Sequence, residues 1–335
     1  MRAGVLQARQ CCPGAALAAV IALSATFVST LHGGPQLLYA LFFGVAFHYL
    51  SHEPATKPGI EFCSRHVLRF GVGLLGARIT AEQIASLGWA TAGLVIAGVL
   101  TTIIGGLMLA RRLGMTHAQG VLSGGAVAIC GASAALAISA VLPKEKDGER
   151  FTLLVVVTVT ALSTVAMVVY PLIARVLHLD PRLAGLFLGG TIHDVAQVVG
   201  AGYTLGPEAG DFATIVKLFR VSMLAVVVVA VAAAFREARA AAPLGHPVAR
   251  QPLVPWFLWM FVGLVVVNSL GALDAPTQEA LGWLSRACLV VAIAALGMKT
   301  SFVQLARAGW RPFGLILAET LWLAALVLAG ILLMG

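Results

Sequence analysis

Long apolar segments constrain the fold of this chain most strongly. They recur along its 335 residues at lengths near ~20 residues, enough for a helix to cross a bilayer, with short charged loops between them. Because a membrane span must satisfy its own backbone, runs this long without alternation favour helices over a barrel. We therefore predict an all-α polytopic membrane protein with about eleven transmembrane helices, at residues 14–31, 35–50, 65–80, 88–110, 118–142, 151–174, 183–203, 213–235, 254–271, 281–299 and 312–333.

The composition agrees with a membrane protein. Only 11% of the residues are charged, whereas a soluble domain carries about 25%. The net charge of +8 is better explained by the positive-inside rule than by nucleic-acid binding. With the N-terminus in the cytoplasm, fourteen of the 22 lysines and arginines lie on the cytoplasmic side. These are Arg2, Arg9, Lys57, Arg65, Arg111, Arg112, Arg175, Arg182, Arg236, Arg239, Arg250, Lys299, Arg307 and Arg311.

The opposite side carries only four of these cations, Arg78, Lys144, Lys146 and Arg150. This asymmetry predicts a bacterial inner-membrane protein with a cytoplasmic N-terminus and a periplasmic C-terminus. An alternative is that the first thirty or so residues are a signal peptide, but a retained first helix keeps the later loops in register with the charge rule. The predicted cytoplasmic loops are 111–117, 175–182, 236–253 and 300–311, and the predicted periplasmic loops are 143–150, 204–212 and 272–280.

An internal repeat relates two parts of the chain. The pattern Ser64-Arg65, Leu75-Gly76-Ala77-Arg78 and Gly88-Trp89 recurs 221 residues later as Ser285-Arg286, Leu296-Gly297-Met298-Lys299 and Gly309-Trp310. The copies are seven spans apart, so they have opposite orientation, with Arg65 at the cytoplasmic end of its helix and Arg286 at the outer end of its own. Inverted-topology repeats are typical of secondary transporters, although a chance match between apolar helices is the alternative. We predict one transporter domain over 1–335, with repeats at about 36–110 and 255–333 around glycine-rich core helices at about 118–235.

Two core helices contain paired glycines at mid-membrane. These are Gly124 and Gly125 in the helix at 118–142, and Gly189 and Gly190 in the helix at 183–203. Each glycine inside a helix costs about 1 kcal/mol relative to alanine. The pairs therefore indicate either close helix packing or interrupted helices whose ends offer free amides to an anion. We expect both helices to be interrupted.

Ionisable and polar residues in the core are the candidate functional groups. His193 and Asp194 lie near the centre of a span, where such groups are costly and suggest a role in proton coupling; a pair that only ties two helices together is the alternative. Lys217 and Arg220 share one helix face through their i, i+3 spacing, and they require an anion, either the substrate or Asp194. The predicted substrate-binding set is Lys217, Arg220, Ser123, Gly124, Gly125, Cys130, Gly131, Ser133, Gly189, Gly190 and Gln197.

Motifs for other functions are absent from the sequence. We find no Gly-Lys-Ser/Thr nucleotide loop, no His-Glu-x-x-His and no Gly-x-Ser-x-Gly element. The five cysteines have no metal-ligand spacing and form no disulfide framework. We therefore expect no enzymatic activity, no cofactor and no metal. The expected partners are a small anion and the lipid bilayer, with a homodimer as the oligomer considered.

Four strings, at 73–78, 129–133, 189–202 and 216–221, stand in an order that resembles the YeiH-type family of proposed sulfate exporters from bacterial inner membranes. The string Gly-Gly-Thr-Ile-His-Asp-Val-Ala-Gln-Val-Val-Gly-Ala-Gly is the specific one, and the resemblance covers the chain beyond its first span. It implies a transporter of sulfate or sulfite. We thus expect a secondary, proton-coupled transporter of a small oxyanion, with a midplane site between the helices at 118–142, 183–203 and 213–235. The alternatives are a cation/proton antiporter with Asp194 as its ion site and a non-transporting membrane scaffold or subunit.

Overall fold

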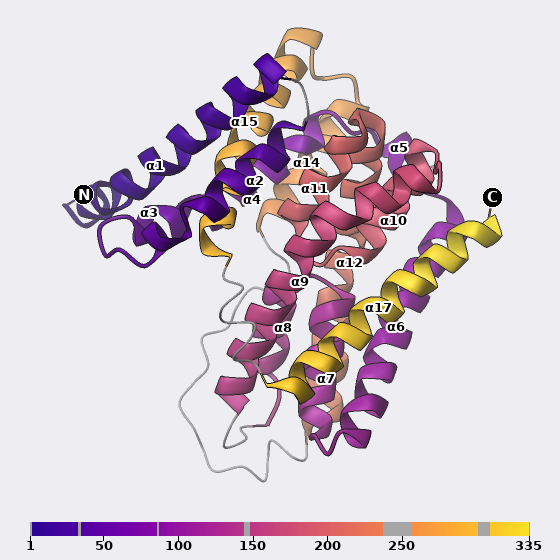
Figure 1. The fold of residues 1–335 in the computed structure, drawn as a ribbon. Helices are drawn as coiled ribbons and strands as arrows, with labels where there is room; N and C mark the ends of the chain where they lie inside the picture. The colour runs from indigo at the N-terminus through magenta and orange to yellow at the C-terminus, as the bar shows by residue number, and fades with distance from the viewer. Residues whose placement is uncertain are drawn as a thin grey trace. The chain divides into compact units, whose positions relative to one another are not determined.

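The computed structural model describes residues 2–32, 35–85, 87–143, 148–236, 256–300 and 309–334. Most of the predicted loops 236–253 and 300–311 lie outside these ranges, as do Lys144, Lys146, Arg239, Arg250 and Arg307. The described chain is helical throughout, without a strand (Figure 1). Its helices are α1 (Arg2–His32), α2 (Gln36–Ala46), α3 (Lys57–Phe62), α4 (Leu68–Leu74), α5 (Ala81–Ala85), α6 (Gly88–Arg112), α7 (His117–Ala128), α8 (Ala132–Ser139), α9 (Gly148–Val176), α10 (Pro181–Thr191), α11 (Val195–Leu205), α12 (Pro207–Ala234), α14 (Trp256–Ser269), α15 (Ala275–Lys299) and α17 (Trp310–Met334), with short turns η1 (His48–Ser51), η2 (Cys63–Val67) and η3 (Leu75–Ala77).

Each of the eleven predicted spans falls on helical residues. Among the described residues, six helices (α1, α6, α9, α12, α15 and α17) are long and apolar enough to cross a membrane. The other predicted spans correspond to shorter or interrupted helices, so the all-helical membrane architecture is confirmed and the count of eleven crossings stays a prediction. Trp89 and Trp310 begin α6 and α17 and are 94% and 72% exposed, as is typical of side chains at a membrane interface.

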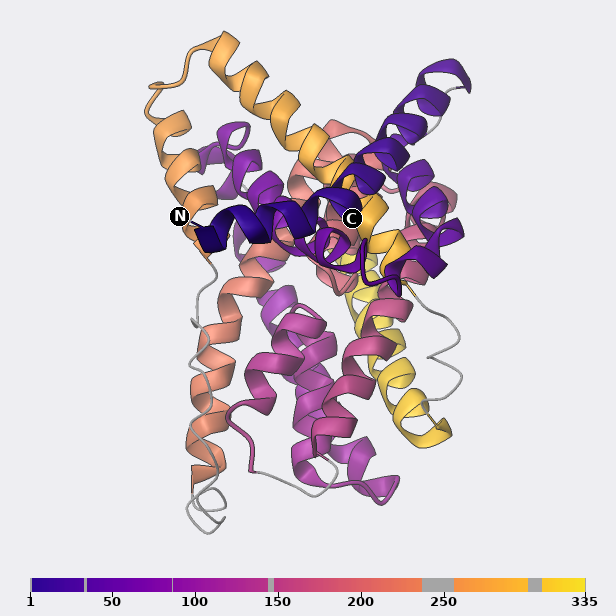
Figure 2. The ribbon, with the colours of Figure 1, turned by 90° about the vertical axis from the view of Figure 1, so that its left-hand side faces the viewer.

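The chain forms two compact units. Unit 1 comprises Met1–Ser86, Val199–Asp211 and Trp256–Ser301, and unit 2 comprises Leu87–Val198, Phe212–Pro255 and Phe302–Gly335. Each predicted repeat therefore contributes its first two spans to unit 1 and its third span to unit 2. Most of the long helix α12 lies in unit 2, and its C-terminal part is drawn in salmon in Figure 2.

Glycines at equivalent repeat positions make equivalent contacts in unit 1. A Cβ atom added to Gly76 would lie 2.3 Å from the carbonyl oxygen of Phe261, and one added to Gly297 would lie 2.4 Å from that of Leu41. Thus η3 approaches α14 of the other repeat as closely as α15 approaches α2. Only glycine permits such backbone contact, which explains the Leu-Gly pairs in both copies.

Equivalent helices of the two repeats run antiparallel. In unit 1, Lys299 near the end of α15 donates to Ser64 before α4 at 3.4 Å, whereas Gly282 near the start of α15 lies beside Arg78 after α4. In unit 2, the same reversal relates α6 and α17, which lie side by side (Figure 1). There Gly98 faces Leu323, Gly106 faces Glu319, and Leu94 faces Gly330. An inverted-topology repeat would place equivalent helices antiparallel, and the repeat itself stays a prediction.

Candidate anion and proton site in unit 2

Both glycine-rich helices are interrupted, as predicted. Helix α7 ends at Ala128 and α8 begins at Ala132, while α10 ends at Thr191 and α11 begins at Val195. Gly131 in the first break has φ +63°, a left-handed conformation that favours glycine. Each break exposes the last carbonyl groups of one half-helix and the first amides of the next. The breaks therefore place four helix ends inside unit 2.

Two buried cations of α12 join these breaks. Lys217 is 0% exposed, and its Nζ donates to the carbonyl oxygens of Ile129 at 2.6 Å and Ile192 at 2.9 Å. One ammonium group thus bridges both interruptions. Since the C-terminal end of a helix carries a partial negative charge, this cation stabilises α7 and α10 together.

Arg220 completes the same junction from the next turn of α12. It is 1% exposed, and its Nε and Nη2 donate to Val127 and Ala128 of α7 at 2.6–3.1 Å. Its Nη1 donates to Gly189 at 3.0 Å and Ile192 at 3.2 Å. These bonds use all five N–H groups of the guanidinium. The contact with a substrate anion that the sequence suggested for Arg220 therefore has no free N–H group in this structure.

His193 holds the second break against α7 and α17. It is 0% exposed, with Nδ1 3.1 Å from the Val127 carbonyl oxygen and Nε2 3.1 Å from Thr320 Oγ1. A carbonyl oxygen only accepts, so we assign the proton to Nδ1. In the neutral ring Nε2 then accepts from the Thr320 hydroxyl, whose other acceptor is the Ile316 carbonyl oxygen at 2.8 Å, and only a doubly protonated ring would donate to Thr320.

Asp194 caps the helix that follows it. Its Oδ1 accepts from the amide of Ala196 at 2.8 Å, a bond typical of an N-cap. Ser163 Oγ accepts from the amides of His193 and Asp194 at 3.2 and 3.1 Å. Asp194 is thus partly buried at the N-terminus of α11, where its carboxylate also interacts electrostatically with Lys217.

The remaining predicted residues divide between the site and the packing around it. Ser123, Cys130 and Gln197 are buried, and Gln197 donates to Thr164 at 2.8 Å. The side chain of Ser133 is exposed on α8. The paired glycines lie at the C-terminal ends of α7 and α10, with Gly124 and Gly125 about one turn before Ala128, and Gly189 and Gly190 directly before Thr191, so they precede the first amides of α8 and α11. They allow close packing: Gly124 faces Ile103 of α6, Gly125 faces Ile138 of α8, Gly189 faces Ala213 of α12, and Gly190 faces Val327 of α17.

Glu319 belongs to this region and was not predicted. It lies in α17, is 3% exposed, and its Oε1 accepts from Ser123 Oγ at 2.8 Å. Its Oε2 has no hydrogen-bond partner among the described residues. Gly106 leaves room for the carboxyl group, because a Cβ there would lie 2.4 Å from Oε1. The signal in the sequence was an acid in the middle of a long apolar helix.

The chemistry available here is binding and proton exchange. No group of three His, Cys, Asp or Glu residues that suits a metal ion occurs in the part of the chain that the structure describes. Glu319 and the adjacent Thr320 connect Ser123 of α7 with His193 of the second break. The titratable groups Glu319 and His193 thus both contact α7, Glu319 at Ser123 and His193 at the carbonyl oxygen of Val127.

Comparisons with known proteins identify relatives across nearly the whole chain. A family model described as "Conserved hypothetical protein 698" matches residues 13–316. UPF0324 membrane protein CT0845 of Chlorobaculum tepidum is 48% identical over 96% of this chain and 90% of its own. UPF0324 membrane protein TauZ of Paracoccus denitrificans is 48% identical over 96% and 95%, and UPF0324 membrane protein Cgl0015/cg0018 of Corynebacterium glutamicum is 33% identical over 99% and 95%. The kinship with YeiH-type proteins is confirmed, and the chain is a multi-pass membrane protein that belongs to the conserved hypothetical protein 698 family.

Proposed function

We propose that this protein is a secondary transporter of a small oxyanion of the sulfate or sulfite class, coupled to protons. The observation that carries the proposal is the junction of two interrupted helices on two buried cations. Lys217 and Arg220 neutralise the negative C-terminal ends of α7 and α10. The positive N-terminal end of α8, where Gly131 provides no side-chain cap, is then left to attract an anion, whereas Asp194 caps that of α11.

The same junction argues against a metal cation as cargo. A cation in an interrupted helix is coordinated by the carbonyl oxygens of the unwound segment. Here those of Ile129 and Ile192 accept from Lys217, and that of Ala128 accepts from Arg220. A metal ion would have to displace a buried cation and approach a second one. The anion is therefore the better partner for this site.

For the proton we propose Glu319, with His193 as its neighbour. A buried carboxyl group with one unpartnered oxygen and no cation in its hydrogen bonds is stable when it is protonated. Asp194, the acid expected from the sequence, is already the cap of α11. Proton release from Glu319 would put a negative charge beside Ser123 and Gly106, where α7 meets α6 and α17. That change in charge would link protonation to the position of α7.

The antiparallel arrangement of equivalent helices supports alternating access. Two inverted copies can exchange conformations and so open one site to each side in turn. This feature speaks against a scaffold without transport activity. A cation/proton antiporter remains the second candidate, because Asp194 and Glu319 are both acids within unit 2.

A thermal-shift screen of the purified protein separates the two candidates. A ligand that binds only the folded state stabilises it by RT ln(1 + [L]/Kd). We expect sulfate or sulfite to raise the melting temperature at constant ionic strength, while chloride and Na⁺ at matched concentration do not. Stabilisation by Na⁺ alone, with none by sulfate, sulfite, sulfonates or carboxylates, would favour the antiporter.

A further inference from the structure

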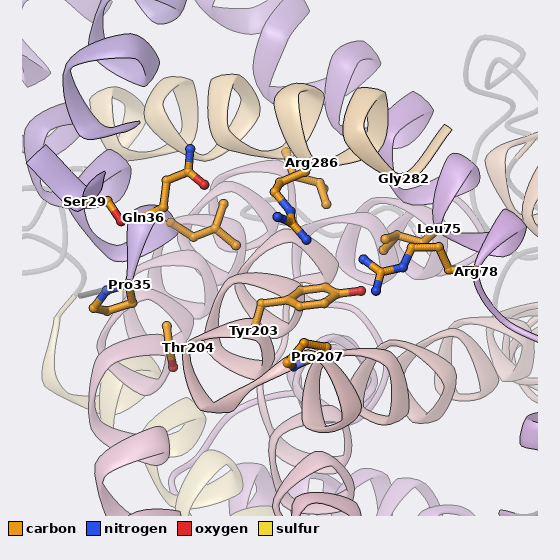
Figure 3. A pocket seen from close by; sticks show the side chains of 12 residues that line it. Ser29, Pro35, Gln36, Leu75, Arg78, Tyr203, Thr204, Pro207, Gly282 and Arg286 are labelled. Carbon is orange, nitrogen blue, oxygen red and sulfur yellow. The ribbon is translucent and has the colours of Figure 1, made fainter. Parts of the chain in front are cut away.

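A small pocket within unit 1 carries two arginines that the proposed site does not use. Its cavity is about 270 Å³, and its polar lining comprises Ser29, Gln36, Arg78, Tyr203, Thr204 and Arg286. Ligand pockets for drug-sized molecules begin at about 300 Å³, so this one suits a molecule of a few heavy atoms. Figure 3 shows the guanidinium groups of Arg78 and Arg286 directed towards Tyr203 from two different helical segments.

The pocket lining contains two arginines and no acid. Asp211 is the acid nearby: it accepts a short hydrogen bond from Tyr203 Oη and interacts electrostatically with Arg78. One carboxylate balances one guanidinium. The backbone N–H of Arg78 donates to Leu75, but among the described residues neither the Arg78 nor the Arg286 guanidinium group donates a hydrogen bond to the protein. Guanidinium groups with free N–H donors bind oxyanions through paired hydrogen bonds.

Two glycines hold the lining side chains in place. The side chain of Arg78 passes over Gly282, where an added Cβ would lie 3.2 Å from Arg78 Cδ. The ring of Tyr203 lies on Gly210, where an added Cβ would lie 2.6 Å from the ring. Tyr203 is also fixed at its other end by Asp211. Packing and hydrogen bonding therefore fix the positions of the Arg78 and Tyr203 side chains in the pocket.

The repeat supplies a second pair of cations at the opposite end of the same two helical segments. Arg78 and Arg286 correspond to Lys299 and Arg65 after the shift of 221 residues. Lys299 at the end of α15 lies beside Ser64, next to Arg65. Because the two segments run antiparallel, one pair lies at each end. An anion carrier with alternating access needs a capture point on each side of the membrane.

We propose that Arg78 and Arg286, with Tyr203, form a capture site for a small oxyanion at the periplasmic mouth of the transporter. This inference rests on the proposed function, and it adds a second anion site apart from the junction at Lys217. Arg65 and Lys299 serve the cytoplasmic side. Each pair raises the local anion concentration and determines the half-saturation constant on its own side, while the maximal rate depends on unit 2.

Labelled sulfate uptake tests the inference in right-side-out and inside-out membrane vesicles. The variant is Arg78→Gln with Arg286→Gln, and its matched control is Arg65→Gln with Lys299→Gln. We expect the first to raise the half-saturation constant about tenfold or more from the periplasmic side only, because charged hydrogen bonds of this strength are lost. The control variant should raise the half-saturation constant from the cytoplasmic side only. Both double variants should retain the maximal rate. A Gly282→Leu variant fills the place of the Arg78 side chain. It should raise the periplasmic half-saturation constant as the Arg78→Gln, Arg286→Gln variant does.

Binding to the purified protein distinguishes failure of this inference from failure of the proposed function. The melting temperature, followed by fluorescence of the six tryptophans, is measured with sulfate and with methanesulfonate for the parent and both double variants. If the parent shows no sulfate flux but loses part of its anion stabilisation in the Arg78/Arg286 variant alone, the capture site stands and transport of sulfate is wrong. If flux and binding in that variant equal those of the parent from both sides, or if no anion stabilises the parent, the capture site is wrong.

Discussion

Trp322 donates from Nε1 to Thr101 Oγ1 at 3.2 Å, and the two residues are 221 positions apart. This separation equals the shift of the internal repeat, so each residue occupies the equivalent position in its own copy. Equivalent positions touch each other where a two-fold axis relates two antiparallel helices. The contact between α6 and α17 thus agrees with inverted repeats at the level of single side chains.

Disulfide cross-linking tests this register. In a cysteine-free background, Thr101→Cys with Trp322→Cys should cross-link efficiently under mild oxidation. Thr101→Cys with Leu333→Cys should not, because eleven further residues place the second thiol about 16 Å along the helix. Equal cross-linking of both pairs would contradict the antiparallel contact, and the gel-shifted product of the oxidised protein measures it.

Loss of the Arg220 side chain should destabilise the fold more than any single apolar truncation in α12. Arg220→Met leaves buried carbonyl oxygens of α7 and α10 unpaired, and we expect a loss of about 3–5 kcal/mol, the cost of removing one partner from a buried ionic contact. Arg220→Lys should restore part of it, since an ammonium donates fewer bonds without the planar geometry. Ser222→Ala is the control, because its exposed hydroxyl bonds only to its own helix at Phe219. Denaturant unfolding in detergent measures the free energy of unfolding of each variant. Equal values for Arg220→Met and Ser222→Ala would contradict the stabilising role of Arg220 at the ends of α7 and α10.

The surroundings of three glycines predict how strongly each Gly→Ala substitution lowers the melting temperature. Gly189→Ala places a methyl 2.4 Å from the backbone oxygen of Ala213 and forces α10 away from α12, so it should lower the melting temperature strongly. At Gly190 the nearest atom is a side-chain methyl of Val327 at 3.2 Å, which can shift, and the loss should be smaller. Gly93 in α6 has nothing within 4 Å, so Gly93→Ala should be neutral or raise stability by up to about 1 kcal/mol. Any other order in a melting series contradicts the packing described here.

Glu319 and Asp194 predict different pH behaviour. Glu319→Gln imitates the protonated carboxyl group, so the protein should fold and retain anion binding but lose the pH dependence of transport. Asp194→Asn keeps an oxygen acceptor for the amide of Ala196, and its pH profile should resemble that of the parent. Uptake rates across a pH series measure both, and difference infrared spectroscopy should show the carboxylic C=O stretch disappear only in Glu319→Gln. If Asp194→Asn alone flattens the profile, Asp194 is the proton carrier, as first expected from the sequence.

Much of the architecture follows from the sequence, because apolar length and paired glycines act locally. Every predicted span contains helix among the described residues, and both glycine-rich helices are interrupted. The breaks begin after the glycine pairs, about one turn after them in α7 and directly after them in α10. The glycines serve close packing, and Lys217 of α12 stabilises the breaks.

The partners of the buried cations could not be derived from the sequence. Lys217 and Arg220 bind main-chain carbonyl groups. Because every residue has such a group, no pattern of side chains in the sequence predicts which ones are the partners. Glu319 was recognisable in principle, as a lone acid within an apolar helix, but its partner Ser123 lies 196 residues away. The pocket in unit 1 likewise combines α11 with segments remote in the chain, and only the fold brings Tyr203 to Arg78 and Arg286.

Sulfate counterflow into proteoliposomes with an imposed pH gradient tests the central claim of proton-coupled anion transport most directly. The purified protein should exchange labelled sulfate or sulfite saturably, and the gradient should change the rate in the parent. In Glu319→Gln the exchange should persist without response to the gradient. The contradicting result is a parent protein that moves protons in exchange for Na⁺ or K⁺ while no sulfate, sulfite, sulfonate or carboxylate crosses above the rate of empty liposomes.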